Sequence, residues 1–444
     1  MNIRAETVPD RDSMSAASIA RADQQHDAVA EQAHVRDFSE LAERLERVGL
    51  SVENLVAAVQ RFEVALPSWA FATGGTRFGR FPGKGEPRTL TEKMEDAALV
   101  HTLTAAAPRI SLHIPWDEPG DVNAVLADAK RLGLGFDAVN SNTFQDQPGQ
   151  ALSYKLGSFS NPNAAVRRQA VEHHRRVIEI GTALGAKAIT VWLADGSNYP
   201  GQMSLRDSFA RVRECLQDVY AAMPADWRLF TEHKPYEPAF YATVVQDWGS
   251  SLLLAQSLGD RAQCLVDLGH HLPNTNIELV VARLLGVGRL GGFHFNDSKY
   301  GDDDLTAGSI TPYTLFLIFH ELVLAEQEQL PGFDPAYMID QSHNLKDPIE
   351  ALLQTVDQLQ QAYAKACLVS HEVLAGHQAS GDVMMAERTL KHAYETDVRP
   401  LVAEARRRKG GALDPVAAFR ASGYRARTSI ERPTALPSIA HTGL

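Results

Sequence analysis

The chain has 444 residues and a formal net charge of −12, with 44% hydrophobic and 22% charged residues. These fractions are ordinary for a globular protein and allow a sizeable buried core. The acidic balance argues against a nucleic-acid partner, because binding to phosphates requires a basic surface. The three cysteines are far apart and odd in number, so we expect neither a disulfide framework nor a thiolate zinc site.

Residues 1–55 are polar and alanine-rich, and we expect a helical segment that is partly disordered. Helical spacing is visible at Val35, Phe38, Leu41 and Leu45, which recur every three or four positions. The start of the chain lacks the apolar stretch of a secretory signal, and no apolar run is long enough to cross a bilayer. Together with the cysteine usage, these features predict a cytoplasmic protein.

Short apolar runs rich in β-formers then alternate with longer amphipathic segments. The runs cover residues 64–69, 109–116, 136–144, 187–196, 228–234, 262–271, 290–298 and 336–343. Strand and helix in repeated alternation predict a (β/α)₈ barrel, which we expect as the catalytic domain over residues 56–360. A doubly wound open sheet is the alternative fold, but the glycine fingerprint that follows its first strand is absent.

Residues 361–444 are expected to form a helical extension and a tail that makes oligomer contacts. From about Arg406 the sequence becomes basic and loop-rich, as in RRRKGGALDP and GYRARTSIERP. The RRRK run has the composition of a nucleic-acid patch, but we interpret it as the solvated end of a helix.

Most of the apolar runs end in polar or aromatic residues, at the place where a (β/α)₈ enzyme builds its active site. Alternate residues of a strand share a face, so Glu232 and Lys234 point the same way, as do His294 and Asn296. We expect the acidic and imidazole groups at these ends to meet at the barrel mouth as metal ligands: Glu232, Asp267, His270, His294, Asp302, Asp304 and Asp340.

Five carboxylates and two imidazoles in one place cannot all remain ionised and unpaired, because like charges repel and raise the carboxylate pKa values. One or two divalent cations would relieve this repulsion. Oxygen and nitrogen ligands without sulfur favour Mn²⁺, Mg²⁺ or Co²⁺ over a structural zinc. Each of these residues taken alone is more often a helix cap, a solvated turn or an ion-pair partner, so the interpretation depends on the whole set.

Large aromatic residues also lie at the ends of the runs. Trp69, Trp116, Trp192 and Phe144 are either core residues or an apolar wall that contacts the C–H face of a sugar. The segment 72–88 is glycine-rich and basic but lacks the spacing of a phosphate-binding loop. We expect it to be a mobile loop over the site or at a subunit contact.

Several segments resemble those of the bacterial L-rhamnose isomerases, above all the broad-specificity, pseudomonad-type branch. The specific segments are TEHK at 231–234, VDLGHH at 266–271 and FNDSKYGDDD at 295–304, in this order and spacing. The resemblance extends from about residue 55 to about residue 427. It implies a barrel related to xylose isomerase, a homotetramer and two divalent metals per subunit, usually Mn²⁺, with Co²⁺, Mg²⁺ and Zn²⁺ as alternatives.

The resemblance also implies roles for individual residues. A structural metal is expected at the positions Glu232, Asp267, His294 and Asp340. A catalytic metal is expected at His270, Asp302 and Asp304, with Asp267 bridging the two metals. Substrate contacts are expected from Trp69, His113, Trp192 and Lys234, from Phe144 in the aromatic wall, and from Phe78 of a neighbouring subunit.

The expected reaction interconverts an aldose and its ketose, L-rhamnose and L-rhamnulose by resemblance, with L-lyxose, L-mannose and D-allose as further substrates. A metal-assisted hydride shift from C2 to C1 is favoured over an enediol route. Lys234 would steady the charge on O1, and His113 would orient the pyranose. The catalytic groups are therefore expected to be His270, Asp302, Asp340, Lys234 and His113.

Two other functions fit part of the pattern. A non-catalytic sugar-binding barrel would keep the aromatic wall, but it would not need the intact HH and GDDDL segments. A metal-dependent phosphodiesterase on a related barrel would use similar ligands, but the acidic net charge argues against a nucleic-acid substrate.

Overall fold

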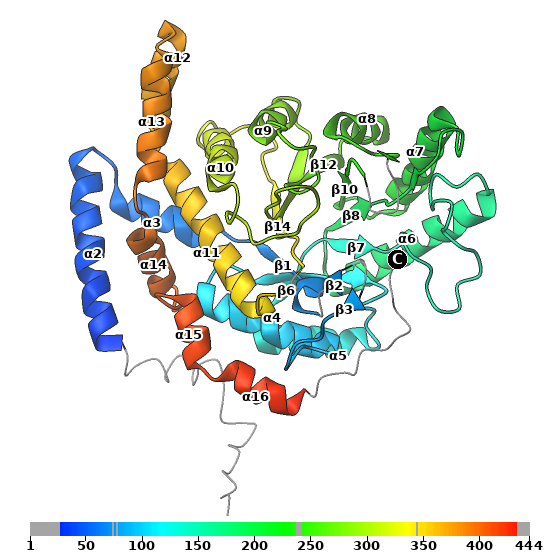
Figure 1. Cartoon of the computed structure of the whole chain (residues 1–444), viewed down its shortest axis with the longest axis horizontal. Coiled ribbons are helices and arrows are strands. Elements are labelled where there is room, and N and C mark those ends of the chain that lie inside the picture. The colour runs from blue at the N-terminus through cyan, green and yellow to red at the C-terminus, as the bar shows by residue number, and fades with distance from the viewer. Residues whose placement is uncertain (1–26, 73–74, 77–78, 237–241, 343–344, 433–444) are drawn as a thin grey trace, which may run out of the picture.

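A closed ring of parallel strands forms the centre of the computed structural model, which describes residues 27–72, 75–76, 79–236, 242–342 and 345–432 (Figure 1). The strands of the ring are β1 (Ala65–Pro67), β4 (Arg109–Ser111), β5 (His113–Ile114), β6 (Gly135–Phe136), β7 (Val139–Ser141), β8 (Ala188–Trp192), β10 (Arg228–Glu232), β12 (Ala262–Asp267), β13 (Leu290–Phe295) and β14 (Ala336–Ile339). Four further short strands, outside the ring, are β2 (Gly75–Thr76), β3 (Gly79–Arg80), β9 (Gly196–Ser197) and β11 (Ala242–Thr243).

The ten strands of the ring occupy eight positions, because two of the positions are interrupted. β4 and β5 are separated by one residue, and β6 and β7 by two residues. β4 pairs with β6 and β5 with β7, while β1 pairs with both β4 and β14. The sheet therefore closes on itself, which confirms the predicted (β/α)₈ barrel and excludes the open doubly wound sheet.

One helix follows each strand position and covers the outside of the ring (Figure 1). These helices are α4 (Leu90–Thr104), α5 (Val122–Leu132), α6 (Ala164–Leu184), α7 (Leu205–Ala222), α8 (Trp248–Leu258), α9 (Ile277–Gly286), α10 (Pro312–Gln327) and α11 (Pro348–Cys367). Capping side chains fix where they begin: Asp121 and Asn163, for example, accept hydrogen bonds from first-turn amides of α5 and α6.

The barrel interior is filled by a small set of apolar side chains from successive strands, namely Ala65, Ala138, Ala188, Phe230, Leu265 and Met338. Phe230 needs the space beside Gly291 of β13, because a Cβ at that glycine would lie 2.6 Å from a ring carbon. The opposite faces of the same strands pack against the helices; Phe295, for example, stacks on Phe319 of α10. The interior is therefore a packed core, and an active site is confined to the barrel mouth.

Helices outside the barrel come from both ends of the described chain. They are α2 (Asp27–Arg47), α3 (Val52–Arg61), α12 (His371–Ser380), α13 (Val383–Glu395), α14 (Arg399–Arg408), α15 (Pro415–Ala421) and α16 (Tyr424–Glu431), together with the 3₁₀ turn η3 (Ser68–Phe71). α2 and α3 both pack on α14, whereas α12 and α13 form a pair that projects from the barrel (Figure 1). None of the helices in the described part of the chain has the length and apolarity needed to span a membrane.

The C-terminal region differs from its prediction in two respects. It is not loop-rich beyond Arg406, because α15 and α16 follow α14. The RRRK run does end a helix, but Arg406 is not solvated: its guanidinium is buried and lies 2.5 Å from Asp357 Oδ1. Arg407 and Arg408 both pair with Glu404. Carboxylates of α14 itself and of other helices, such as Asp357 of α11, neutralise this basic run, which composition alone does not reveal.

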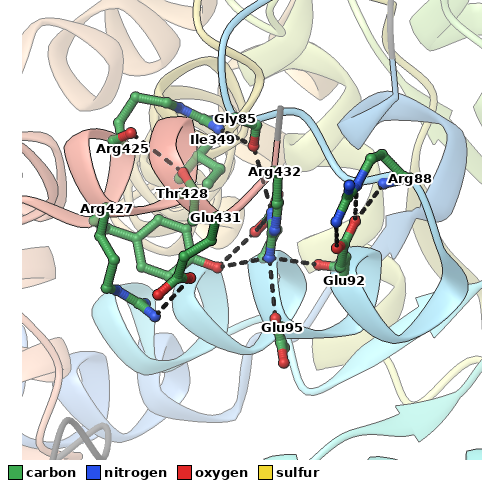
Figure 2. A network of polar contacts seen from close by, with 12 residues as sticks. Gly85, Arg88, Glu92, Glu95, Ile349, Arg425, Arg427, Thr428, Glu431 and Arg432 are labelled. Atoms are coloured by element: carbon green, nitrogen blue, oxygen red, sulfur yellow. Dashed lines mark hydrogen bonds and ion pairs between the residues drawn. The ribbon is translucent and has the colours of Figure 1, made fainter. Parts of the chain in front are cut away.

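The last helix is fastened to α4 by a buried polar network (Figure 2). Arg432 lies 2.8 Å from Asp96 Oδ1 and 3.0 Å from Glu95 Oε2. Tyr424 donates its hydroxyl to Asp96 at 2.6 Å, and Arg425 donates to the carbonyl of Gly85 at 2.8 Å. Residues 424–432 therefore form polar contacts with both α4 and the end of the glycine-rich segment 72–88.

Candidate metal centre

The alternation of side chains along the strands brings the acidic groups to the barrel mouth. Phe230 and Leu265 fill the interior, and two residues later on the same faces come Glu232 and Asp267. Both carboxylates are buried. The same alternation places the polar residues at the ends of β13 and β14, so that four neighbouring strands contribute to one site.

One set of side chains surrounds the imidazole of His294. Its Nδ1 atom lies 3.1 Å from Glu232 Oε1, 3.6 Å from Asp340 Oδ2 and 3.8 Å from Asp267 Oδ2. One ligand atom from each of the four residues lies within 4.8 Å of the others. Three oxygens and one nitrogen at this spacing can hold a divalent cation.

A second set shares Asp267 with the first. Asp267, His270 and Asp302 also offer ligand atoms within 4.8 Å of one another, and His270 Nε2 lies 3.2 Å from Asp302 Oδ1. Lys234 Nζ lies 2.5 Å from Asp302 Oδ2. Asp304 lines the same cavity, with its backbone in the left-handed region at a φ of 48°. The two sets are therefore adjacent and joined by one carboxylate.

The protonation of this cluster shows how much negative charge is gathered there. Burial raises the pKa of Asp267 to about 7, and burial likewise raises the pKa of Asp340 above its ordinary value. Although burial disfavours the imidazolium, the surrounding carboxylates raise the pKa of His294 to about 9. Protons thus offset the repulsion between carboxylates, and divalent cations could take over that role.

An unsatisfied atom of the cluster is consistent with cation binding. Asp267 Oδ2 is buried and has no hydrogen-bond partner within the part of the chain that the structure describes. A buried polar atom without a partner costs free energy, so such atoms are rare unless a ligand or water satisfies them. The donor set of carboxylates and imidazoles therefore fits two hard or borderline divalent cations.

Next to the cluster is a cavity of about 230 Å³ with an aromatic wall. Trp116 stacks on His113 with ring centres 4.2 Å apart, and Phe144 meets Trp192 edge-on at 4.7 Å. Lys234 Nζ lies 4.9 Å from the centre of the Trp192 ring. The cavity thus has charged ligands on one side and ring faces on the other, an arrangement that suits a small polyol.

His113 is held in the wall by a buried ion pair. Its backbone N–H donates to Asp117 Oδ2 at 2.9 Å, and Lys93 Nζ lies 2.6 Å from Asp117 Oδ1. Burial lowers the pKa of His113 to about 3. The imidazole is therefore neutral at physiological pH, and its buried Nδ1 has no partner among the described residues. It can form a hydrogen bond with an uncharged hydroxyl group.

Several polar residues near the strand ends face elsewhere. Asp303 accepts hydrogen bonds from the backbone of Lys299 and Tyr300 and shapes its own turn. Asp195 accepts from the backbone amides of Ser158 and Ser160. His271 meets His233 edge-on at 4.9 Å, so of the two adjacent histidines it is His270 that joins the ligand sets. Phe78 lies outside the described residues.

Two hydrogen-bond donors to the ligands do not follow from the sequence pattern. Trp69 Nε1 donates to Asp340 Oδ1 at 2.7 Å, and Asn296 Nδ2 donates to Asp267 Oδ1 at 2.9 Å. Asn140, which lies near the end of another strand, is a further cavity residue. Their positions at strand ends were visible in the sequence, but the atoms they contact depend on side-chain orientation across neighbouring strands.

The chain is similar in sequence over nearly its whole length to two bacterial proteins. It is 59% identical over 398 residues to a probable sugar isomerase of Mesorhizobium japonicum, covering 90% of this chain and 92% of that protein. It is 57% identical to a probable sugar isomerase of Rhizobium meliloti, again over 90% of this chain. A xylose isomerase of Thermus thermophilus is 30% identical over 49% of this chain and 60% of its own length.

Solved structures support the fold. An L-ribulose 3-epimerase superposes with a TM-score of 0.51 at 16% identity, over 70% of this chain and 98% of the epimerase. No family model matches the sequence.

Proposed function

Since this chain belongs to the same family as the probable sugar isomerases of its rhizobial relatives, we propose that it is a metal-dependent aldose–ketose isomerase of the L-rhamnose isomerase type. One observation supports the proposal most strongly. Two potential ligand sets share Asp267 and lie beside a cavity with an aromatic wall. Moving a hydrogen between two carbons of a sugar requires polarised oxygens at both carbons, and paired cations beside a sugar-sized cavity meet that need.

The proposed metal sites use the ligand sets described above. Glu232, Asp267, His294 and Asp340 would hold one cation, and Asp267, His270 and Asp302, with Asp304 beside them, the other. When bound, these cations would supply Lewis acidity at neighbouring oxygens of the open-chain sugar. Mn²⁺ is the proposed metal, with Co²⁺, Mg²⁺ and Zn²⁺ as alternatives.

The side chains around the cavity have separate tasks in this proposal. Lys234, whose ammonium already lies against Asp302, would donate a hydrogen bond to O1 and stabilise negative charge there. The neutral imidazole of His113 would bind a ring hydroxyl and orient the pyranose. The rings of Trp69, Trp192 and Phe144 would cover the C–H face of the sugar and exclude water.

Metal removal and replacement tests the proposal. The protein is stripped with a chelator, Mn²⁺, Co²⁺, Mg²⁺ and Zn²⁺ are added back singly, and ketose formation is measured with L-rhamnose, L-lyxose, L-mannose and D-allose. We expect no turnover without metal and the highest turnover with Mn²⁺ and L-rhamnose. Full turnover by rigorously demetallated protein would refute the metal-dependent mechanism.

The route of the hydrogen is a separate question. We propose a hydride shift, in which the C2 hydrogen moves with its electron pair to C1 while the O2 proton is removed and O1 is protonated. Deuterium placed at C2 should then be found at C1 of the ketose, without loss to the solvent. Substantial exchange with water, measured by mass spectrometry, would favour the enediol route.

We also propose a homotetramer. The pair α12 and α13 projects from the barrel (Figure 1). Near the start of α13 the pair exposes apolar side chains, including Val383 at 77% and Met384 at 71%. Such side chains away from the core are typical of protein contacts. Light scattering should give about four times the chain mass of 48.6 kDa. A monomer at micromolar concentration would contradict this assembly.

A further inference from the structure

We propose that Asn296 is a positioning residue that fixes the orientation of Asp267, the carboxylate shared by the two ligand sets. This inference rests on the proposed metal-dependent function. It assigns to Asn296 a role in setting metal affinity, through Asp267 and without direct contact to the sugar.

The two oxygens of Asp267 have different surroundings. Oδ1 accepts hydrogen bonds from the backbone N–H of Gly269 at 2.7 Å and from Asn296 Nδ2 at 2.9 Å. Oδ2 is buried, has no hydrogen-bond partner among the described residues and lies 3.8 Å from Nδ1 of His294. Two donors thus fix one oxygen and leave the other directed towards the ligands of the first set.

The position of Asn296 is well defined by its strand. It directly follows the end of β13, two residues after His294, and 1% of its surface is exposed. Its Oδ1 has no hydrogen-bond partner within the described part of the chain. A buried amide with an unsatisfied carbonyl is unfavourable. Asn296 Nδ2 donates a hydrogen bond to the ligand residue Asp267, and a positioning role explains this contact.

Gly269 keeps the space that this arrangement needs. A Cβ at this position would lie 3.3 Å from both Asp267 Oδ1 and Asn296 Oδ1, and 3.5 Å from Asp302 Oδ1. Three oxygens from three residues therefore surround the place that a side chain at residue 269 would occupy. The glycine lets the amide of residue 269 approach the shared carboxylate while Asn296 approaches from the other strand.

Without the hydrogen bond from Asn296, only the backbone N–H of Gly269 would still hold Asp267 Oδ1, and the carboxylate could rotate more easily. Like charges surround it, and turning away from them would relieve repulsion in the metal-free protein. A cation would then have to restore the orientation on binding, at a cost in affinity. Removing an outer hydrogen-bond partner of a metal ligand typically weakens metal affinity by about 10- to 100-fold.

The test replaces Asn296 with Leu, which has a similar shape and no donor, and measures Mn²⁺ binding by calorimetry in the full-length protein. We expect wild type to bind two Mn²⁺ per chain and Asn296→Leu to bind at least one of them about 10- to 100-fold more weakly. Asn142→Leu is the matched control, because Asn142 is also a buried asparagine at a strand end and its side-chain amide has no hydrogen-bond partner among the described residues. The control should keep both affinities.

The possible outcomes separate this inference from the proposed function. If wild type binds two Mn²⁺ and Asn296→Leu binds them equally well, the positioning role is refuted and the metal-dependent function stands. If wild type binds no Mn²⁺, both are refuted. Should Asn296→Leu fail to fold, judged by circular dichroism, Asn296→Ser serves instead, because the hydroxyl is too short to reach Asp267; the same loss of affinity is expected.

Discussion

At the scale of single residues, Lys234 stands between the charged and the aromatic sides of the cavity. Replacing it with Met keeps the alkyl chain over Trp192 and removes the ammonium beside Asp302. Because stabilisation of developing charge is lost, we expect kcat to fall by about 100- to 1000-fold at saturating metal, with a smaller change in KM. Lys299→Met, in an exposed turn, is the control and should keep kcat. A fall of less than tenfold in Lys234→Met would argue against the role on O1.

Trp69 combines two functions that a substitution can separate. Its ring lines the cavity, and its Nε1 donates to Asp340 Oδ1 at 2.7 Å. Trp69→Phe keeps an aromatic surface and removes the donor, so we expect Mn²⁺ affinity to fall by about tenfold. Trp116→Phe, which alters a wall ring that stacks on His113, should leave Mn²⁺ affinity unchanged. If metal titration gives both variants the Mn²⁺ affinity of wild type, the indole donor does not orient Asp340.

The residues of the site show what a sequence can and cannot predict at this scale. Glu232 and Asp267 were predictable as neighbours at the barrel mouth, because strand alternation and parallel pairing fix where the side chains point. The contacts of Trp69 and Asn296 were not, because each depends on a rotamer and on the distance to another strand. The turn geometry likewise separates Asp303 from its neighbours, because its carboxylate accepts hydrogen bonds from the backbone of Lys299 and Tyr300.

At the scale of elements, the network of Arg432 links α16 to α4 (Figure 2). Arg432→Met would leave Asp96 buried without its guanidinium partner. Breaking a buried ion pair from one side typically costs about 3 kcal/mol, so the free energy of unfolding should fall by about that amount. Urea unfolding followed by circular dichroism measures the change. Arg427→Met, which removes a more exposed pair within α16, should cost less than about 1 kcal/mol. Equal costs would show that burial of the network is unimportant.

The prediction of elements succeeded where the local pattern was strong. All eight apolar runs contain barrel strands. The strands are shorter than the runs, because the ends of the runs belong to the loops that carry the site. The interruption between β6 and β7 has no signal in composition. The helices α15 and α16 were missed because their stability comes from contacts with distant segments, such as Arg425 with Asp347.

At the scale of the whole molecule, closure of the barrel explains why one site collects ligands from distant parts of the sequence. Glu232 and Asp340 are more than one hundred residues apart, yet both approach His294 because their strands lie on either side of one mouth. The packed interior beneath them denies water a route from below. The fold therefore concentrates negative charge at the barrel mouth. The helices and the interior side chains cannot neutralise this charge, whereas cations from solution can.

The molecule as a whole should lose stability in acid through histidines that are buried in the neutral form. Burial lowers the pKa of His174 to about 3 and that of His320 to about 4, both from an unfolded value of 6.5. At a pH between the folded pKa values and the unfolded value of 6.5, these histidines bind fewer protons in the folded chain than in the unfolded chain. The stability they contribute is therefore complete above pH 6.5 and is lost as the pH falls towards the folded pKa values.

His174 allows this prediction to be tested apart from the metal ligands. On α6 it hydrogen-bonds Ser141 Oγ at 2.7 Å and the carbonyl of Ala170 at 2.8 Å, and it belongs to neither ligand set. His174→Gln removes the titrating group and keeps an amide that can hydrogen-bond. We expect its melting temperature to be lower than that of wild type at pH 7.5 and to fall less steeply between pH 7.5 and pH 5. His392→Gln, on the exposed face of α13, should keep the wild-type slope. Protonation of the metal ligands affects all three proteins alike, so identical slopes would mean that His174 contributes nothing to the loss of stability in acid.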